Sequence, residues 1–209
     1  MSSPVLWYAT RTTGLVALVL LTVTTVFGVL TATRFATERW PGFAQQDLHR
    51  RVSLVSVVFL GGHVLTSVLD SYVHIGWAAV VVPFASDYKR FWVGVGTISL
   101  DLMLAVLVTS LLRHRIPARA WRAVHWLAYL SWPVAVAHGL AMGTDMRTAW
   151  VLALTATCIA AVVGAVAFRI GSAAVAAGRA REVGAVRNRP AGVGLKHLPS
   201  SPATRPATR

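Results

Sequence analysis

The sequence has few charged residues and only one cysteine. Charged side chains make up 13% of its 209 residues, only seven are Asp or Glu, and 56% of the residues are hydrophobic. The single Cys158 cannot form an internal disulfide, so we expect it to be a small apolar packing residue. Cysteine therefore gives no information about the redox compartment.

The sequence contains several long apolar runs. A helix needs about 20 apolar residues to cross a bilayer, and helices satisfy their own backbone groups in hydrocarbon. The sequence therefore predicts an all-α membrane protein, a bundle of about five transmembrane helices with a short basic cytoplasmic tail. The expected spans are residues 14–33, 49–71, 91–112, 121–142 and 148–170.

Two apolar stretches need a separate interpretation. The first run is longer than the 7–15 apolar residues that are typical of a signal peptide, so we expect it to be retained as a helix. Residues 75–84 are too short to cross and contain Pro83, which favours an interfacial or re-entrant segment. A sixth span at residues 75–84 is the alternative.

The distribution of basic residues predicts the orientation in the membrane. Only Arg11, Lys89, Arg90 and Arg147 fall on one side of the predicted spans, and the positive-inside rule assigns that side to the exterior. We expect a multi-pass protein of the cell membrane, with the N-terminus outside, the C-terminus in the cytoplasm and the lipid bilayer as partner. Nucleic acid is not an expected partner, because no basic residues interleave with aromatics on a folded platform. The residues assigned to the cytoplasmic side are Arg34, Arg39, Arg50, Arg51, Arg113, Arg115, Arg119, Arg122 and the basic residues from Arg169 onward.

The composition changes after residue 170, which suggests two parts, a transmembrane domain over residues 1–170 and a basic tail over residues 171–209. The tail begins as an alanine-rich amphipathic continuation and ends in SSPATRPATR, so we predict disorder in its last twenty residues. Neither GxGxxG nor GxxxxGK[ST] occurs in the tail, and we expect no flavin or NAD(P) site in this chain. A separate flavin-containing or quinone-linked redox partner is therefore expected.

Four histidines lie in two pairs within apolar segments. His49 and His63 are 14 residues apart, and His125 and His138 are 13 apart, or roughly 20 Å along a helix axis. Ionisable residues inside a membrane mark functional sites. Because the second and fourth spans run in the same direction, the pairs match in depth, and two stacked b-type haems would need this spacing. We predict haem iron between His49 and His125, and between His63 and His138.

The angular spacing of the histidines is less regular. Fourteen residues return to within about 40° of the same helix face, whereas thirteen fall roughly 140° away. Pro133 lies between His125 and His138, and we hypothesise that it bends the helix and corrects the mismatch. Gly61, Gly62 and Gly139 next to the histidines would leave room for a flat macrocycle, or would only allow close helix packing.

Other interpretations of the histidines remain open. A single-haem, quinol-linked subunit would use only one pair. A haem-free bundle acting as a transporter, sensor or assembly partner would use the histidines as interhelical hydrogen-bonding groups. A zinc site is excluded, because pairs about 20 Å apart cannot converge on one ion. His74, His114 and His197 are expected to be solvated.

Residues 7–145 resemble the ferric reductase-like transmembrane domain family, which is related to NADPH oxidase membrane domains and to the haem-binding membrane subunit of periplasmic methionine sulfoxide reductase. The stretches that carry the resemblance are WYATRTTGLVALVLL, LHRRVSLVSVVFLGGH, PFASDYKRFWVGVGTISLDLMLAVLVTSLLRHRI and WRAVHWLAYLSWPVAVAHGLAMGTD. Family members commonly have six spans, and many carry flavin and nicotinamide domains that do not occur here.

The resemblance implies a membrane electron-transfer subunit of an oxidoreductase. It implies that His49, His63, His125 and His138 are the axial ligands of two haems that pass electrons across the membrane. We further hypothesise that Arg11 meets the propionates of an outer haem. Additional hypotheses place Arg50, Arg51 or Arg122 at an inner haem, Asp101 in proton movement, and Asp145 at a loop cap or an acceptor.

Overall fold

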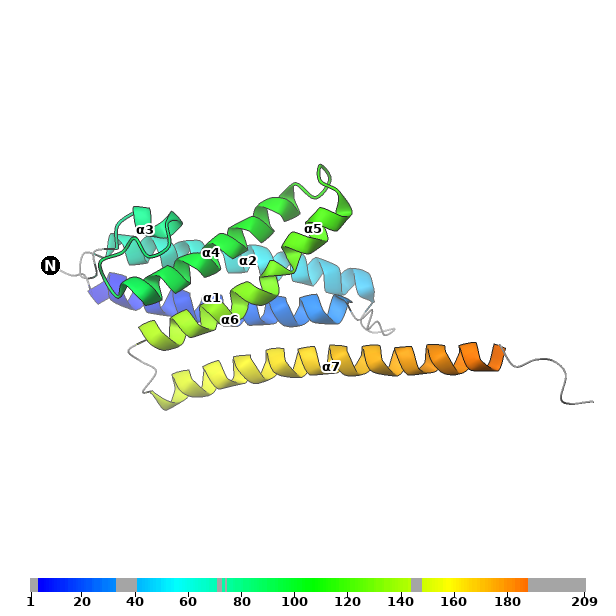
Figure 1. Cartoon of the computed structure of the whole chain (residues 1–209). Coiled ribbons are helices and arrows are strands. Elements are labelled where there is room, and N and C mark those ends of the chain that lie inside the picture. The colour runs from blue at the N-terminus through cyan, green and yellow to red at the C-terminus, as the bar shows by residue number, and fades with distance from the viewer. Residues whose placement is uncertain (1–3, 33–40, 71–72, 74, 144–147, 188–209) are drawn as a thin grey trace, which may run out of the picture. The chain divides into compact units, whose positions relative to one another are not determined.

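The computed structural model describes residues 4–32, 41–70, 73, 75–143 and 148–187, and within these residues the chain is helical with no strand. The chain divides into two compact units, residues 1–170 and residues 171–209. The elements are α1 Pro4–Ala32, α2 Gly42–Leu69, α3 Ala78–Val81, α4 Arg90–Leu111, α5 Ala118–His125, α6 Leu127–Met142 and α7 Ala149–Arg187 (Figure 1).

Four of these helices, α1, α2, α4 and α7, are long and apolar enough to cross a membrane. This confirms the prediction of an all-α, multi-pass membrane protein. The prediction of one continuous helix over residues 121–142 is wrong, because this span consists of the eight-residue α5 and the sixteen-residue α6 in succession. Residues 75–84 hold only the four-residue α3, which is too short to cross a membrane, and their interfacial or re-entrant position stays a prediction.

The interruption between α5 and α6 lies at Trp126. The Trp126 N–H donates to the Arg122 and Val124 carbonyls, and the Tyr129 N–H donates to the Trp126 carbonyl at 3.1 Å, three residues back instead of four. This local tightening changes the angle between the faces of α5 and α6. Helix α6 continues through Pro133. The hypothesis that Pro133 corrects the angular mismatch stays a prediction, and Trp126 is a second irregularity in the same span.

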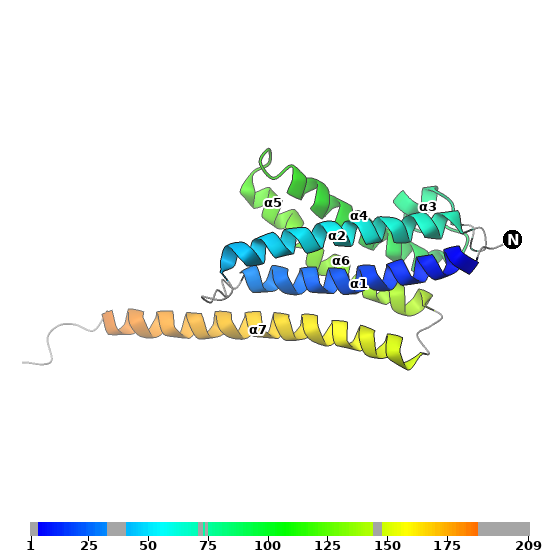
Figure 2. The same ribbon diagram turned by 180° about the vertical axis from the view of Figure 1, so that it is seen from behind.

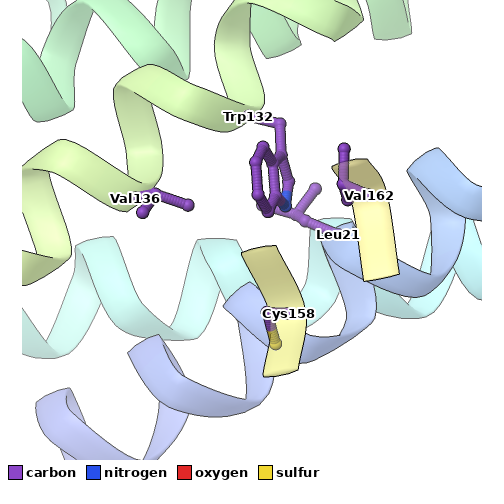
Figure 3. Packing of buried hydrophobic residues seen from close by; sticks show 5 residues of the cluster. All are labelled: Leu21, Trp132, Val136, Cys158 and Val162. Carbon is purple, nitrogen blue, oxygen red and sulfur yellow. The ribbon is translucent and has the colours of Figure 1, made fainter. Parts of the chain in front are cut away.

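Helices α1 and α2 run side by side, as do α4 and α6, and α1 also packs against α6 (Figures 1 and 2). A buried cluster joins α1, α6 and α7. Trp132 of α6 lies in the middle of this cluster (Figure 3), and its Nε1–H donates to Thr22 Oγ1 of α1 at 3.0 Å. The cluster consists of Leu21, Trp132, Val136, Cys158 and Val162. Cys158 is thus a buried packing residue, as expected.

Polar hydrogen bonds supplement this apolar packing. Ser99 Oγ of α4 donates to the Ser131 carbonyl of α6 at 2.9 Å, and Thr24 Oγ1 of α1 lies 3.3 Å from Ser56 Oγ of α2. Small hydroxyl side chains of this kind let helix backbones approach closely inside a membrane. They fix the two helix pairs that carry the site described below.

Helix α7 has 39 residues, or about 58 Å at the α-helical rise. That is about twice the 30 Å hydrocarbon thickness of a bilayer. Residues 171–187 continue the helix, as the alanine-rich sequence predicts. Residues 188–209 lie outside the described part of the chain, so the predicted disorder of the last twenty residues stays a prediction.

Candidate functional site

The structure brings the four histidines together in the two pairs that their depths predict. The ring centroids of His49 and His125 lie 6.3 Å apart with an interplanar angle of 71°. The centroids of His63 and His138 lie 6.4 Å apart with an angle of 79°. In each pair one ring comes from α2 and the other from the α5–α6 segment. All four side chains are half-buried, and the rings of each pair stand nearly perpendicular to each other.

In the His63–His138 pair both rings are held by backbone carbonyls of neighbouring helices. His63 Nδ1–H donates to the Thr10 carbonyl of α1 at 2.9 Å, and His138 Nδ1–H donates to the Trp92 carbonyl of α4 at 2.7 Å. Because a carbonyl oxygen can only accept, these bonds place the proton on Nδ1. Nε2 is then the nitrogen with a free lone pair, which is the arrangement that metal-bound histidines use.

Two glycines make room for these rings. A Cβ at Gly14 of α1 would lie 2.9 Å from His63 Nδ1, and a Cβ at Gly96 of α4 would lie 2.5 Å from His138 Nδ1. Real Cβ atoms do not approach so closely, so a larger residue at either position would displace the ring. Each histidine of this pair is therefore fixed by a carbonyl and by a facing glycine.

The His49–His125 pair is held less completely. His49 Nδ1–H donates to the Thr24 carbonyl of α1 at 3.1 Å, and a Cβ at Gly28 would approach its ring only to 3.4 Å. The His125 ring instead stacks on Trp121, with centroids 4.9 Å apart and an interplanar angle of 26°. Among the described residues, the buried His125 Nδ1 has no hydrogen-bond partner.

Helix geometry explains how both pairs form. Helix α2 is continuous from Gly42 to Leu69, so a separation of 14 residues returns His63 close to the face of His49. His125 and His138 would lie on different faces of one regular helix. The interruption at Trp126 allows both rings to meet α2.

The glycines that contact the rings were not among those that the sequence suggested. Nothing lies within 4 Å of a Cβ built at Gly61 or Gly139, and the nearest atom at Gly62 is a Thr13 methyl at 3.7 Å. The suggestion that these glycines leave room for a macrocycle therefore stays a prediction. The glycines that face the rings, at positions 14, 28 and 96, lie on the adjacent helices.

The arginines suggested as propionate partners have different surroundings. Arg11 follows Thr10, whose carbonyl binds His63, and its guanidinium lies 3.9 Å from the centroid of the Trp7 ring. Arg50, Arg51 and Arg122 are exposed, and Arg51 forms a 2.7 Å ion pair with Asp47. Arg11 follows a residue whose carbonyl binds a site histidine, and Arg122 follows Trp121, whose ring stacks on His125.

The remaining candidates lie elsewhere. Asp101 is half-buried on α4 and makes no hydrogen bond or ion pair within the described residues. His114 is exposed, as expected for a solvated side chain. Asp145, His74 and His197 lie outside the described residues.

Arg169 makes two contacts that were not predicted from the sequence. From α7 it donates through NH1 to Tyr129 Oη at 3.2 Å, and its guanidinium lies 5.1 Å from the centroid of the Trp126 ring. Arg169 therefore contacts α6 and the α5–α6 interruption, next to His125. The available signal was a single arginine at the end of a long apolar run.

Each histidine pair could hold one metal centre through two nitrogens. No group of three or more His, Cys, Asp or Glu side chains that could hold a metal ion occurs within the described ranges. A site of this kind provides two opposed ligands and requires that the remaining ligands come from a cofactor.

The fold defines a helical, multi-pass membrane protein with two pairs of histidines between its helices. The family model described as "Ferric reductase like transmembrane component" matches residues 13–136. This match covers more than half of the sequence, and the chain belongs to the ferric reductase-like transmembrane family. It is a membrane redox component. No curated protein and no solved structure matches the chain.

Proposed function

We propose that the chain carries electrons across the membrane through two b-type haems, one between His49 and His125 and one between His63 and His138. The observation that carries the proposal is the spacing of the rings in each pair. Imidazole nitrogens bind metal ions at about 2.0–2.1 Å, so two opposed imidazoles on one metal place their centroids roughly 6 Å apart. The separations of 6.3 and 6.4 Å fit this arrangement.

The hydrogen bonds of the histidines support the same assignment. His49, His63 and His138 each donate Nδ1–H to a backbone carbonyl, which leaves Nε2 to bind iron and increases its basicity. Histidines that served only as hydrogen-bonding groups between helices would not need two rings nearly perpendicular at this separation. This observation disfavours the haem-free bundle.

The protein holds the irons, orients their ligands and excludes water. A haem in each pair would supply reversible one-electron chemistry of iron, tuned by the ligands and their hydrogen bonds. Along α2 the two pairs are separated by roughly 20 Å. The pairs therefore form two successive steps across most of a bilayer about 30 Å thick.

The positions of the basic residues support the proposed orientation in the membrane. With the basic connections and tail in the cytoplasm, the His49–His125 pair is the inner one and the His63–His138 pair the outer one. Electrons then pass from a cytoplasmic or membrane donor to an extracytoplasmic acceptor. The donor is a separate flavin-containing or quinone-linked protein, and this chain is the electron-transfer subunit.

Arg11 is proposed to lie beside the propionates of the outer haem, because it follows the residue whose carbonyl binds His63. Replacing Arg11 with alanine should shift the midpoint potential of one haem and leave the other unchanged, as measured by a spectroscopic redox titration. Unchanged haem content and unchanged potentials would remove this assignment.

The proposal is tested by the haem content of the purified protein. Two b-type haems per chain are expected in the reduced-minus-oxidised spectrum and in haem quantitation. The double variants H49A/H125A and H63A/H138A should each retain one haem. A single haem that survives only one of the double variants would support the quinol-linked subunit with one site, and no haem under adequate haem supply would refute both.

A further inference from the structure

Asp101 is an acidic residue in the middle of α4 that the proposed electron path does not use. It lies roughly midway between Arg90 and Leu111, or about 15 Å from each end of the helix. A carboxylate at this depth of a membrane is costly unless it is paired. Its side chain is too short to reach the interface, as long Lys and Arg side chains do. Asp101 therefore requires a partner within the membrane.

The contacts of α4 show which way Asp101 faces. A Cβ at Gly96 would meet the His138 ring, and Ser99 Oγ donates to the Ser131 carbonyl, so both residues mark the side of α4 that packs on α6. Asp101 follows Ser99 by two residues, or about 200° around the helix. It therefore lies on the side of α4 away from α6. Within the described residues this half-buried side chain makes no hydrogen bond or ion pair.

The α3 segment packs on the preceding turns of the same side of α4. Thr97 Oγ1 donates to the Ala79 carbonyl at 2.6 Å, and a Cβ at Gly94 would overlap the Phe84 ring. Asp101 comes one helical turn after Thr97. It therefore lies at the edge of the part of α4 that α3 covers.

The turns that follow Asp101 are apolar and open. Leu104 and Val108 lie one and two turns further along the same side of α4, and they are 44% and 49% exposed. Asp101, Leu104 and Val108 together are called the α4 face below. The α4 face combines a carboxylate with an apolar surface at membrane depth.

Charge and depth limit what can cover the α4 face. Lipid headgroups lie about 15 Å from the middle of the bilayer, so they do not reach Asp101. No Lys or Arg occurs in residues 14–33, 52–71, 91–112, 123–142 or 148–168. A second copy of this chain in the same orientation would therefore place no basic side chain opposite Asp101. The charge calls for a Lys or Arg from a different chain.

We propose that the α4 face binds the transmembrane helix of a separate membrane protein, and that this helix carries a Lys or Arg at the depth of Asp101. The ion pair neutralises both charges inside the membrane and fixes the depth of the partner helix. Leu104 and Val108 supply the apolar contact. The inference goes beyond the proposed function and does not depend on haem.

A synthetic transmembrane helix tests the proposal. The full-length purified protein is placed in phosphatidylcholine vesicles with a Leu/Ala peptide that carries one central Lys, and association is measured by energy transfer between fluorophores. This peptide should bind roughly tenfold more tightly than the same peptide with a central Leu, as expected for a polar contact between membrane helices. Asp101→Asn should remove the preference.

Two controls separate the ion pair from general attraction of charge. A peptide with its Lys at one end has the same charge at a different depth, so it should bind no better than the Leu peptide. Asp47→Asn is the matched variant, because Asp47 is 56% exposed and pairs with Arg51. It should keep the preference for the central Lys. Equal binding of the central-Lys and Leu peptides, or a preference that persists in Asp101→Asn, would contradict the proposal.

Crosslinking in the membranes of cells that naturally make the protein identifies the class of partner. Benzoylphenylalanine in place of Leu104 should crosslink to a different chain with a Lys or Arg inside a span, and Asp101→Asn should abolish the product. The same residue in place of Leu130, which is 54% exposed on α6, is the control and should not give this product. A crosslink only to a second copy, only to lipid, or to a chain without such a basic residue would overturn the inference.

Haem content keeps this inference apart from the proposed function. Asp101→Asn should retain the haem content of the unmodified protein, because Asp101 faces away from α6 and His138. Absence of haem from the unmodified protein would refute the proposed function and leave the helix-binding face standing. Two haems together with no preference for the central-Lys peptide would refute this inference alone.

Discussion

The two histidine pairs have nearly the same ring separation but are supported differently. In the His63–His138 pair both rings donate to carbonyls, and a Cβ added at the glycine facing each ring would lie closer than 3 Å to it. In the His49–His125 pair, His49 donates to a carbonyl, but a Cβ at Gly28 would approach its ring only to 3.4 Å. The His125 ring instead stacks on Trp121. The comparison shows that two pairs with nearly the same ring separation can have unequal support from the surrounding helices. The difference lies in the helices behind the histidines.

The largest expected effect comes from filling the space behind the tighter pair. Gly96→Ala places a methyl group against His138, so it should lower haem affinity in the His63–His138 pair by roughly ten- to hundredfold. Gly14→Ala should have a smaller effect, and Gly28→Ala the smallest of the three, because its Cβ contact is 3.4 Å. Haem quantitation and competition with apomyoglobin would rank the three variants.

Gly61→Ala and Gly139→Ala are the controls for this series, since a Cβ at either position meets nothing within 4 Å. Alanine also favours the helix over glycine by about 1 kcal/mol in water. Both controls should retain full haem content. If Gly28→Ala were as damaging as Gly96→Ala, the proposed difference in rigidity between the pairs would be wrong.

Arg169→Ala should weaken haem binding at the His49–His125 pair and not at the His63–His138 pair. The variant removes the hydrogen bond to Tyr129 and the contact with Trp126, where α5 ends directly after His125. The loss of a hydrogen bond to a charged group is expected to cost about 1.5–3 kcal/mol. The haem of the His49–His125 pair should therefore dissociate faster while the other is unchanged. Arg169→Lys should recover only part of the effect, because lysine lacks the planar guanidinium.

How much the sequence can predict is illustrated by the histidines and their glycines. The apolar runs and the similar spacing of the histidines, 14 and 13 residues, were sufficient to predict the helical bundle and the two pairs by depth. The facing glycines at positions 14, 28 and 96 were not predictable, because their role depends on which helix packs behind each ring. Sequence proximity favoured Gly61 and Gly139, where an added Cβ would meet nothing within 4 Å.

The interruption of the fourth span is a second feature that could not be predicted from the sequence. Pro133 was the visible helix-breaking signal, but α6 continues through it and the hydrogen-bond pattern changes at Trp126. Nothing in the local sequence WRAVHWLAY indicates a break, since each residue is compatible with a helix. Tertiary contacts from α7, including Arg169, accompany the interruption. Such contacts cannot be read from the residues alone.

The smallest expected effect is that of Arg51→Ala. Arg51 and Asp47 form a 2.7 Å ion pair, but their side chains are 75% and 56% exposed. An exposed pair four residues apart on a helix contributes about 0.5 kcal/mol or less. The variant should leave haem content and the dissociation rates of both haems unchanged. Loss of one haem would instead place Arg51 at the inner site.

Electron paramagnetic resonance of the oxidised protein at low temperature tests the central claim most directly. Nearly perpendicular axial imidazoles leave the iron d orbitals almost degenerate, which gives a low-spin ferric signal with a large maximum g value. The interplanar angles of 71° and 79° predict two such signals, one removed in H49A/H125A and the other in H63A/H138A. High-spin signals with all four histidines present, or two signals that both survive either double variant, would contradict the account.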